Sequence, residues 1–234
     1  MAEGHVILEF EKVTIPAIAH QSSGIRDVSF RLMAMEIALI SVTPTSEYLP
    51  LADAAEGLAA PESGVVRFDG QSWTAMGARG ESLARGRIRR VFDSDGWISN
   101  LDLMENLVLA EAHHTHRSEH ELAAEADGWA RFFGLEGVPD GRPDRMSGPI
   151  LRKLEWVRAF MGSAALLIID RAALGVPQED MDRLVEGVCG AAARGMAILW
   201  TTSEDYIRAH NALSHARRYA VRGSELLLEE RAEP

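Results

Sequence analysis

Residues 165–172 read ALLIIDRA, and this stretch indicates the fold because residues 166–169 form an unbroken apolar run. Such a run is typical of a strand that is buried on both faces of a parallel sheet. Residues 37–42 (IALISV) and 197–201 (AILWT) show the same pattern. Segments of helical character separate these runs along the chain. The sequence therefore predicts an α/β core with a mostly parallel sheet.

Capping residues mark the ends of several predicted helices. Ser118 is a suitable N-cap and Gly134 a suitable C-terminal glycine for a helix over residues 118–134. Asp102 can cap a helix over residues 103–110 in the same way. Further helices are predicted at residues 48–58, 147–160, 178–193 and 204–212.

The remaining strands predict a smaller β-subdomain beside the core. Residues 25–32 alternate between apolar and polar side chains, and residues 6–13 mix the two patterns, as in antiparallel strands. Shorter strands are predicted at residues 65–68, 88–92, 216–221 and 225–229. We predict a single domain over residues 1–234, in which residues 1–92 and 161–234 form the α/β core with its β-subdomain. Residues 93–160 are expected to form a helical lobe.

Composition and charge exclude several classes of function. The chain has 234 residues, of which 47% are hydrophobic and 25% charged, so a disordered chain is excluded. A net charge of −11 argues against binding to nucleic acid or to an anionic membrane surface. A single cysteine, Cys189, rules out a disulfide within the chain. No signal peptide or membrane-spanning run is recognised, and a cytoplasmic location is expected.

Several stretches carry a family resemblance that extends over residues 8–229. They are GIRDVSFRL (24–32), GLAAPESGVVRFDG (57–70), NLDLMENLVL (100–109), RPDRMSGPILRKLEWVRAF (142–160) and ALLIIDRA (165–172). In their order and spacing they resemble the nucleotide-binding subunit of an ABC transporter. The resemblance implies a P-loop NTPase-like, mostly parallel sheet with an N-terminal antiparallel β-subdomain and a helical subdomain. It also implies ATP and Mg²⁺ as ligands and a membrane permease as partner.

The phosphate-binding loop of that family is strongly altered in this chain. The family pattern is G-x-x-x-x-G-K-[ST], in which glycines bring backbone N–H groups to the phosphates and the lysine neutralises their charge. Residues 42–49 read VTPTSEYL and contain no glycine and no lysine. The matching positions include Val42, Thr45, Ser46, Glu47, Tyr48 and Leu49. Tyr48 stands at the lysine position and Leu49 at the position of the Mg²⁺-binding hydroxyl. We expect this loop to repel ATP.

The positions that carry catalysis in the family are altered as well. Asp170 keeps the position of the carboxylate that helps hold Mg²⁺. The next residue, a glutamate in the family, is Arg171, which cannot accept a proton. Ser203 replaces the switch histidine of the family, and Asp93 replaces the glutamine that senses the metal. Pro177 replaces an aspartate that, in the family, faces the partner subunit. No residue is assigned a catalytic role.

The signature motif is kept in part. Ser147 and Gly148 match residues that, in the family, contact a γ-phosphate bound by the other subunit. Pro149 and Ile150 replace a glycine and a glutamine, which removes a backbone donor and an amide. Trp97 lies where the family meets its membrane subunit, and it is either an interface anchor or a cover for the core.

Asp170 and a group of histidines each allow a structural as well as a functional interpretation. Asp170 is a vestigial metal ligand or, as we favour, a structural residue that caps a loop or pairs with Arg171. The histidines of residues 113–120 follow no known ligand spacing, and a solvated loop between helices is favoured over a metal site. No metal is expected, and no cofactor, unless the family function with ATP and Mg²⁺ is retained.

Three hypotheses about function follow from the resemblance. The favoured one is a catalytically inactive ABC subunit that acts as a structural or regulatory partner of a permease or of an active ATPase subunit, as a homodimer or heterodimer. The sequence at residues 57–70 and 100–109 is similar to that of ATP-binding subunits from bacterial exporters and lipid-transport systems. Such a subunit is cytoplasmic and peripheral at the inner membrane, without inserting into it. The alternatives are an active ATPase with atypical motifs and a soluble regulatory or scaffold module unrelated to transport.

Overall fold

The centre of the molecule is a six-stranded sheet. The computed structural model describes residues 4–18, 22–43, 48–92, 96–171 and 176–229. The strand order is β10-β9-β3-β8-β7-β6, and all neighbours are parallel except β9 and β10. The strands are β3 (Ile37–Ser41), β6 (Ile88–Val91), β7 (Leu166–Asp170), β8 (Ala197–Thr202), β9 (Arg217–Arg222) and β10 (Glu225–Leu228). The predicted mostly parallel sheet is confirmed.

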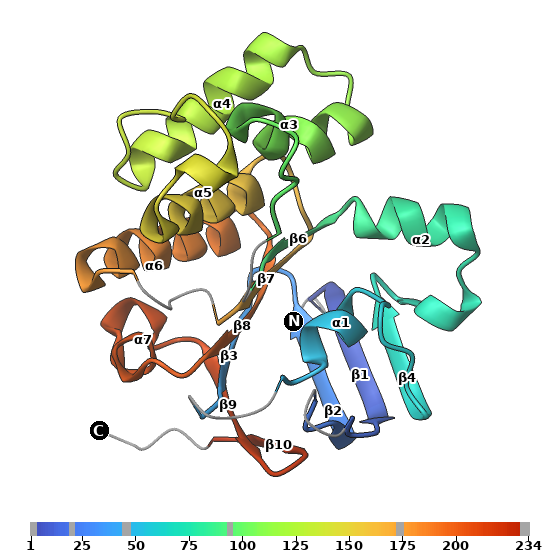
Figure 1. Ribbon diagram of the computed structural model, residues 1–234. Coiled ribbons are helices and arrows are strands. Elements are labelled where there is room, and N and C mark those ends of the chain that lie inside the picture. The colour runs from blue at the N-terminus through green and yellow to red at the C-terminus, as the bar shows by residue number, and fades with distance from the viewer. Residues whose placement is uncertain (1–3, 19–21, 44–47, 93–95, 172–175, 230–234) are drawn as a thin grey trace.

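A four-stranded antiparallel sheet forms the β-subdomain. Its order is β2-β1-β4-β5, with β1 (Val6–Ile15), β2 (Ile25–Met33), β4 (Ser63–Phe68) and β5 (Gln71–Ser72). Figure 1 shows this sheet beside the short helix α1 (Leu51–Ala55), on the opposite side of the central strands from α4, α5 and α6. The N-terminal antiparallel subdomain is therefore also confirmed.

The larger helices gather on the other side of the central sheet (Figure 1). They are α3 (Leu103–His114), α4 (Glu119–Phe132), α5 (Gly148–Phe160) and α6 (Gln178–Ala193). Asp102 and Ser118 begin α3 and α4 with complete capping boxes, in which Glu105 and Glu121 return the hydrogen bond. Gly134 has a φ of +82°, as a C-terminal glycine requires. The division of the chain at residues 92 and 161 stays a prediction.

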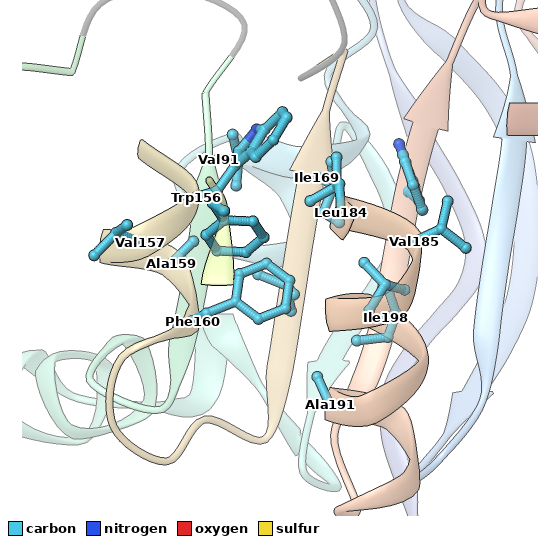
Figure 2. Close-up of a cluster of buried hydrophobic side chains, with 14 of the residues drawn as sticks. Val91, Trp156, Val157, Ala159, Phe160, Ile169, Leu184, Val185, Ala191 and Ile198 are labelled. Carbon is cyan, nitrogen blue, oxygen red and sulfur yellow. The ribbon is translucent and has the colours of Figure 1, made fainter. Parts of the chain in front are cut away.

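The central strands are buried on both faces, and their side chains alternate between two apolar cores. On β7, Leu167 and Ile169 pack with the large helices, whereas Leu166 and Ile168 pack with α1 and the β-subdomain. Figure 2 shows the first core, in which Trp156 and Phe160 of α5 lie beside Ile169. This alternation explains the unbroken apolar runs of the sequence.

Two predicted helices are shorter than expected. Helix α1 covers Leu51–Ala55 and not residues 48–58, because Pro50 precedes it and Gly57 adopts a φ of +67° that ends it. The segment 204–212 divides at His210 into α7 (Asp205–Ala209) and a 3₁₀ turn (Asn211–Leu213).

Helix α2 (Ala78–Arg85) was not predicted, since Ala84 is its only buried residue and the apolar periodicity is weak. The prediction of a solvated loop for the histidines of residues 113–120 was wrong in part, because α3 extends to His114 and includes His113. In the part of the chain that the structure describes, no helix is both long and apolar enough to cross a bilayer.

Candidate functional site

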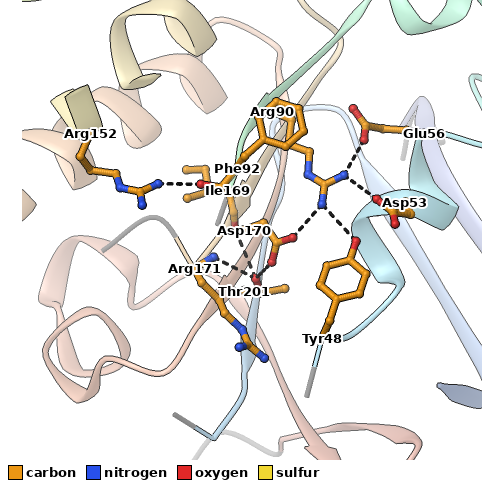
Figure 3. A network of polar contacts seen from close by, with 10 residues as sticks. All are labelled: Tyr48, Asp53, Glu56, Arg90, Phe92, Arg152, Ile169, Asp170, Arg171 and Thr201. Atoms are coloured by element: carbon orange, nitrogen blue, oxygen red, sulfur yellow. Dashed lines mark hydrogen bonds and ion pairs between the residues drawn. The ribbon is translucent and has the colours of Figure 1, made fainter. Parts of the chain in front are cut away.

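The side chain of Arg90 lies at the centre of a polar cluster near the carboxyl end of the central strands (Figure 3). Its Nη1 donates to Asp53 Oδ1 at 2.7 Å and to Glu56 Oε2 at 2.8 Å. Its Nη2 donates to Asp170 Oδ2 at 2.9 Å and to the hydroxyl of Tyr48 at 3.1 Å. Strand β6, the helix α1 region, strand β7 and the segment after β3 thus meet on one guanidinium. The side chain of Arg90 is only 7% exposed.

Both carboxylate oxygens of Asp170 are engaged. Oδ2 accepts from Arg90, and Oδ1 accepts from the hydroxyl of Thr201 at 2.8 Å. The structural interpretation of Asp170 offered either the capping of a loop or a pair with Arg171, and it did not foresee Arg90. Among the described residues its ion pair is with Arg90. The backbone of Arg171 has a φ of +50°, and its N–H donates to the carbonyl of Thr201 at 3.1 Å.

Tyr48 is fixed by its backbone as well as by its hydroxyl. Its carbonyl accepts from the N–H of Ser23 at 3.1 Å, and it forms an isolated parallel bridge with Ser22. Burial raises the pKa of the Tyr48 phenol above its ordinary value, so the group is neutral at pH 7. The residue at the lysine position is thus an uncharged member of a polar cluster.

The cluster is rich in negative charge. Burial raises the pKa of Glu56, although Arg90 opposes this shift. Burial also disfavours the Arg90 cation, but its hydrogen bond to Asp53 and the charge of Glu56 outweigh this and raise its pKa. One guanidinium thus lies among three carboxylates, those of Asp53, Glu56 and Asp170.

The other predicted positions near the phosphate loop are placed as follows. Val42 and Leu49 are buried, with exposed fractions of 9% and 7%, and the N–H of Val42 donates to the carbonyl of Thr202 at 3.0 Å. Ser203 is half-buried in the segment after β8. Thr45, Ser46, Glu47 and Asp93 lie outside the described residues.

The signature positions lie apart from this cluster. Ser147 and Gly148 are exposed at the beginning of α5, which lies on the helical side and away from α1 (Figure 1). Pro149 stands in the first turn of α5, where its missing N–H is tolerated. The chain therefore presents the partly kept motif on its surface and not toward its own Arg90 cluster.

Trp97 takes part in the core and lies next to exposed apolar surface. It is half-buried against the helical core, and the guanidinium of Arg158 lies 5.0 Å from the centre of its ring. Arg158 also donates to the carbonyl of Gly96 at 2.6 Å. The neighbouring Ile98 is 43% exposed and Phe92 is 36% exposed. The core interpretation and the interface interpretation of Trp97 both find support in this placement.

The residues of the Arg90 cluster do not fit a nucleotide with Mg²⁺. Each oxygen of Asp170 accepts a hydrogen bond within the chain, and the Arg90 cation paired with Oδ2 opposes the approach of Mg²⁺. The guanidinium of Arg90 is already shared by three carboxylates. In the described part of the chain, no group of three or more His, Cys, Asp or Glu residues is arranged to hold a metal ion.

Sequence reasoning missed Arg90, Asp53 and Glu56. A signal was present, because Arg89 and Arg90 occupy the middle of the short predicted strand at residues 88–92, and Asp53 and Glu56 are three residues apart on a predicted helix. Only the fold brings these positions to Tyr48 and Asp170.

The fold is that of an ABC ATPase, as comparison with solved structures shows. A dimeric ATP-binding cassette in a post-hydrolysis state with ADP and Pi matches with a TM-score of 0.82 and 16% identity, over 97% of this chain and all of the other. The ATP-binding subunit of an ABC transporter matches with a TM-score of 0.75 and 21% identity, over 94% and 88% of the two chains.

Curated relatives point to the same family. Nod factor export ATP-binding protein I of Paraburkholderia xenovorans is 29% identical over 146 residues, which cover 62% of this chain and 46% of the relative. The intermembrane phospholipid transport system ATP-binding protein MlaF of Escherichia coli is 25% identical over 130 residues, which cover 56% of this chain and 48% of the relative. The matches span about half the length of these relatives. No protein-family model matches the chain. The resemblance to ABC transporter nucleotide-binding subunits is confirmed in sequence and in fold.

Proposed function

We propose that this chain is a non-catalytic subunit of an ABC-type transport assembly. The observation that carries the proposal is the engagement of Asp170 and Tyr48 by Arg90 within the chain. A carboxylate paired with a guanidinium is a poor Mg²⁺ ligand, because the cation repels the metal, and a neutral phenol cannot neutralise phosphate charge. The excess of carboxylates around Arg90 opposes the approach of a polyphosphate.

The lack of a catalytic base supports the same proposal. Arg171 follows Asp170, and a guanidinium cannot take a proton from an attacking water. Ser203, at the predicted switch position, carries a hydroxyl, which is far less basic than the imidazole it replaces. The loss of several different groups leaves no single compensating change that could restore hydrolysis.

The proposed role is to dock onto a permease or beside an active ATPase subunit at the cytoplasmic face of the membrane. Ser147 and Gly148 are exposed and could complete a nucleotide site whose phosphate loop belongs to the partner subunit. Ile98 and Phe92 offer exposed apolar surface next to Trp97 for a permease. The names of the relatives, which act in export and in phospholipid transport, favour a lipid or export substrate.

The proposal is tested by isolating the tagged chain from its native host and measuring phosphate release by the complex and by the chain alone. We expect a multispanning membrane protein or a second ATP-binding cassette in the complex, and no Mg²⁺-dependent turnover by the chain alone. Turnover by the chain alone that Asp170→Ala abolishes would establish an active ATPase instead. A stable complex without any membrane protein or ATPase subunit would favour a soluble scaffold module.

A second variant tests the role of the signature motif in a complex with an active subunit. Ser147→Ala is expected to lower the turnover of the complex, because it removes a hydroxyl that faces the partner's nucleotide. Ser82→Ala, at an exposed position of α2, is the matched control and should leave turnover unchanged. Equal turnover in both variants would contradict a composite site.

A further inference from the structure

Helix α1 has little stability of its own. It has only five residues, and Pro50 at its N-cap provides no side-chain hydrogen bond. A helix of this length is not stable by itself in water. Its buried face consists of Leu51 and three alanines, which remove little apolar surface from water. Contacts from outside the helix must therefore fix its position.

Two arginines provide these contacts. Arg90 of β6 binds Asp53 within α1 and Glu56 at its C-cap. Arg85 of α2 donates to the carbonyl of Glu56 at 3.0 Å and to that of Gly57 at 3.2 Å. Arg85 thus satisfies two carbonyls at the C-terminal end of the helix. Arg90 adds charged hydrogen bonds to the apolar packing of α1 against the central sheet.

Arg90 joins α1 to the sheet through Asp170 at the end of β7. In open α/β sheets, ligands bind outside the carboxyl ends of the strands. At this edge the guanidinium is almost fully buried, lies 4.9 Å from the centre of the Phe92 ring and donates to four different side chains. A bound cationic ligand would be expected to show the same burial and the same set of acceptors.

We propose that the Arg90 side chain is a resident cation, which fills this site from within the chain and holds α1 against the sheet without any bound ligand. The inference deepens the proposed function, on which it rests: the site is fixed in one state, so nucleotide cannot change it. The subunit then presents the same surface to its partners whether ATP is present or absent.

Electrostatics explain why the cation is needed. Without it, the carboxylates of Asp53, Glu56 and Asp170 would lie close together and repel one another, and water would reach Asp170 and Glu56 only poorly. Removing Arg90 should therefore leave a site that attracts an external cation of the same shape. Guanidinium itself is the probe, because its planar fork of donors matches carboxylate geometry.

The experiment compares Arg90→Ala with Arg67→Ala, without nucleotide in any sample. Arg67 also forms two ion pairs with carboxylates, but on the outer face of the β-subdomain. We expect Arg90→Ala to lower the Tm by at least about 6 °C and Arg67→Ala by a few degrees at most. Hydrogen exchange of residues 51–55 should accelerate in Arg90→Ala only. Equal melting and equal exchange in the two variants would overturn the proposal.

Rescue provides the second readout. Guanidinium chloride at a low, non-denaturing concentration should raise the Tm of Arg90→Ala relative to an equal concentration of sodium chloride. It should not raise the Tm of the unmodified chain or of Arg67→Ala. Guanidinium that acts alike on all three proteins would contradict a resident-cation site.

A milder variant covers the case in which Arg90→Ala does not fold. Arg90→Lys keeps the charge but loses the fork that reaches four acceptors. We expect a Tm clearly below that of the unmodified chain, and an equal Tm would overturn the proposal. Because ATP is absent throughout, these results are independent of whether the proposed lack of nucleotide binding is correct.

Discussion

Two arginine-centred clusters in this molecule use the same chemistry in different surroundings. Arg90 shares its guanidinium among Asp53, Glu56 and Asp170. Arg67, on β4, shares its guanidinium between Glu9 at 3.2 Å and Glu11 at 2.7 Å. The side chain of Arg90 is 7% exposed, and that of Arg67 is 30% exposed. Burial is therefore the main difference between the two clusters.

This difference decides what each cluster can do. Around Arg67, water and salt screen the charges, so the ion pairs contribute little to the free energy of unfolding. Around Arg90, the guanidinium and the carboxylates of Asp170 and Glu56 have lost most of their water and depend on one another for hydrogen bonds, whereas Asp53 is 32% exposed. The Arg67 cluster is a solvated face of a sheet, whereas the Arg90 cluster lies where a ligand would bind.

The largest expected effect is the contrast between Arg90→Ala and Arg67→Ala in chemical unfolding. Arg90→Ala leaves buried carboxylates unpaired and should cost about 3–5 kcal/mol of stability. Arg67→Ala should cost about 1 kcal/mol or less, and this small loss should shrink further at high salt. Urea titrations of both variants at low and high salt provide the measurement. Equal losses would show that burial does not separate the clusters.

Asp170→Asn is expected to have the next largest effect. The amide keeps the shape but loses one charge-assisted hydrogen bond, which should cost about 1–3 kcal/mol. A double-mutant cycle with Arg90→Ala isolates the interaction between the two residues. We predict strong coupling in the cycle, and simple additivity of the two losses would refute a direct ion pair.

Tyr48→Phe tests the residue at the lysine position. The variant removes the hydroxyl that accepts from Arg90 and should cost about 1–2 kcal/mol. Tyr219→Phe is a suitable control, because Tyr219 lies outside the cluster and its side chain is buried, whereas Tyr48 is half-buried. If Tyr48→Phe were as stable as the unmodified chain, the hydroxyl would have no part in the cluster.

The smallest expected effect is a pH dependence at Glu56. Burial raises its pKa in the folded state, so protonation favours folding, and this contribution is lost as pH rises through the folded pKa. Glu56→Gln cannot titrate. The stability of the unmodified chain relative to Glu56→Gln should therefore increase as pH falls from neutral toward 4.5, the ordinary carboxyl value. A relative stability that decreases over this range would reverse the assigned shift.

The fold could be predicted from the sequence because apolar periodicity reports burial directly. The runs that became β3, β7 and β8 alternate between two cores, and the capping residues Asp102 and Ser118 begin their helices as predicted. Helix α1 was predicted too long, because Pro50 lies inside the predicted segment and was not treated as a boundary.

The site could be predicted only in part. The family resemblance singled out Tyr48, Asp170 and Arg171, and their roles stay predictions. The sequence did not indicate the partner of Asp170, because Arg90 lies 80 residues away. In the sequence, Asp53 and Glu56 resemble ordinary exposed residues of a helix. Only the fold shows that β6 lies beside them. Residue pairs that meet only across a sheet leave no periodic signal in one sequence.

The most direct test of the account is calorimetric titration of the purified chain with ATP and Mg²⁺, up to millimolar nucleotide. The account predicts no saturable heat and no rise in Tm, because Arg90 already engages Asp170 and Tyr48 within the chain. Saturable binding in the micromolar range, with a matching rise in Tm, would contradict it. That result would show that a nucleotide can displace Arg90 from Asp170.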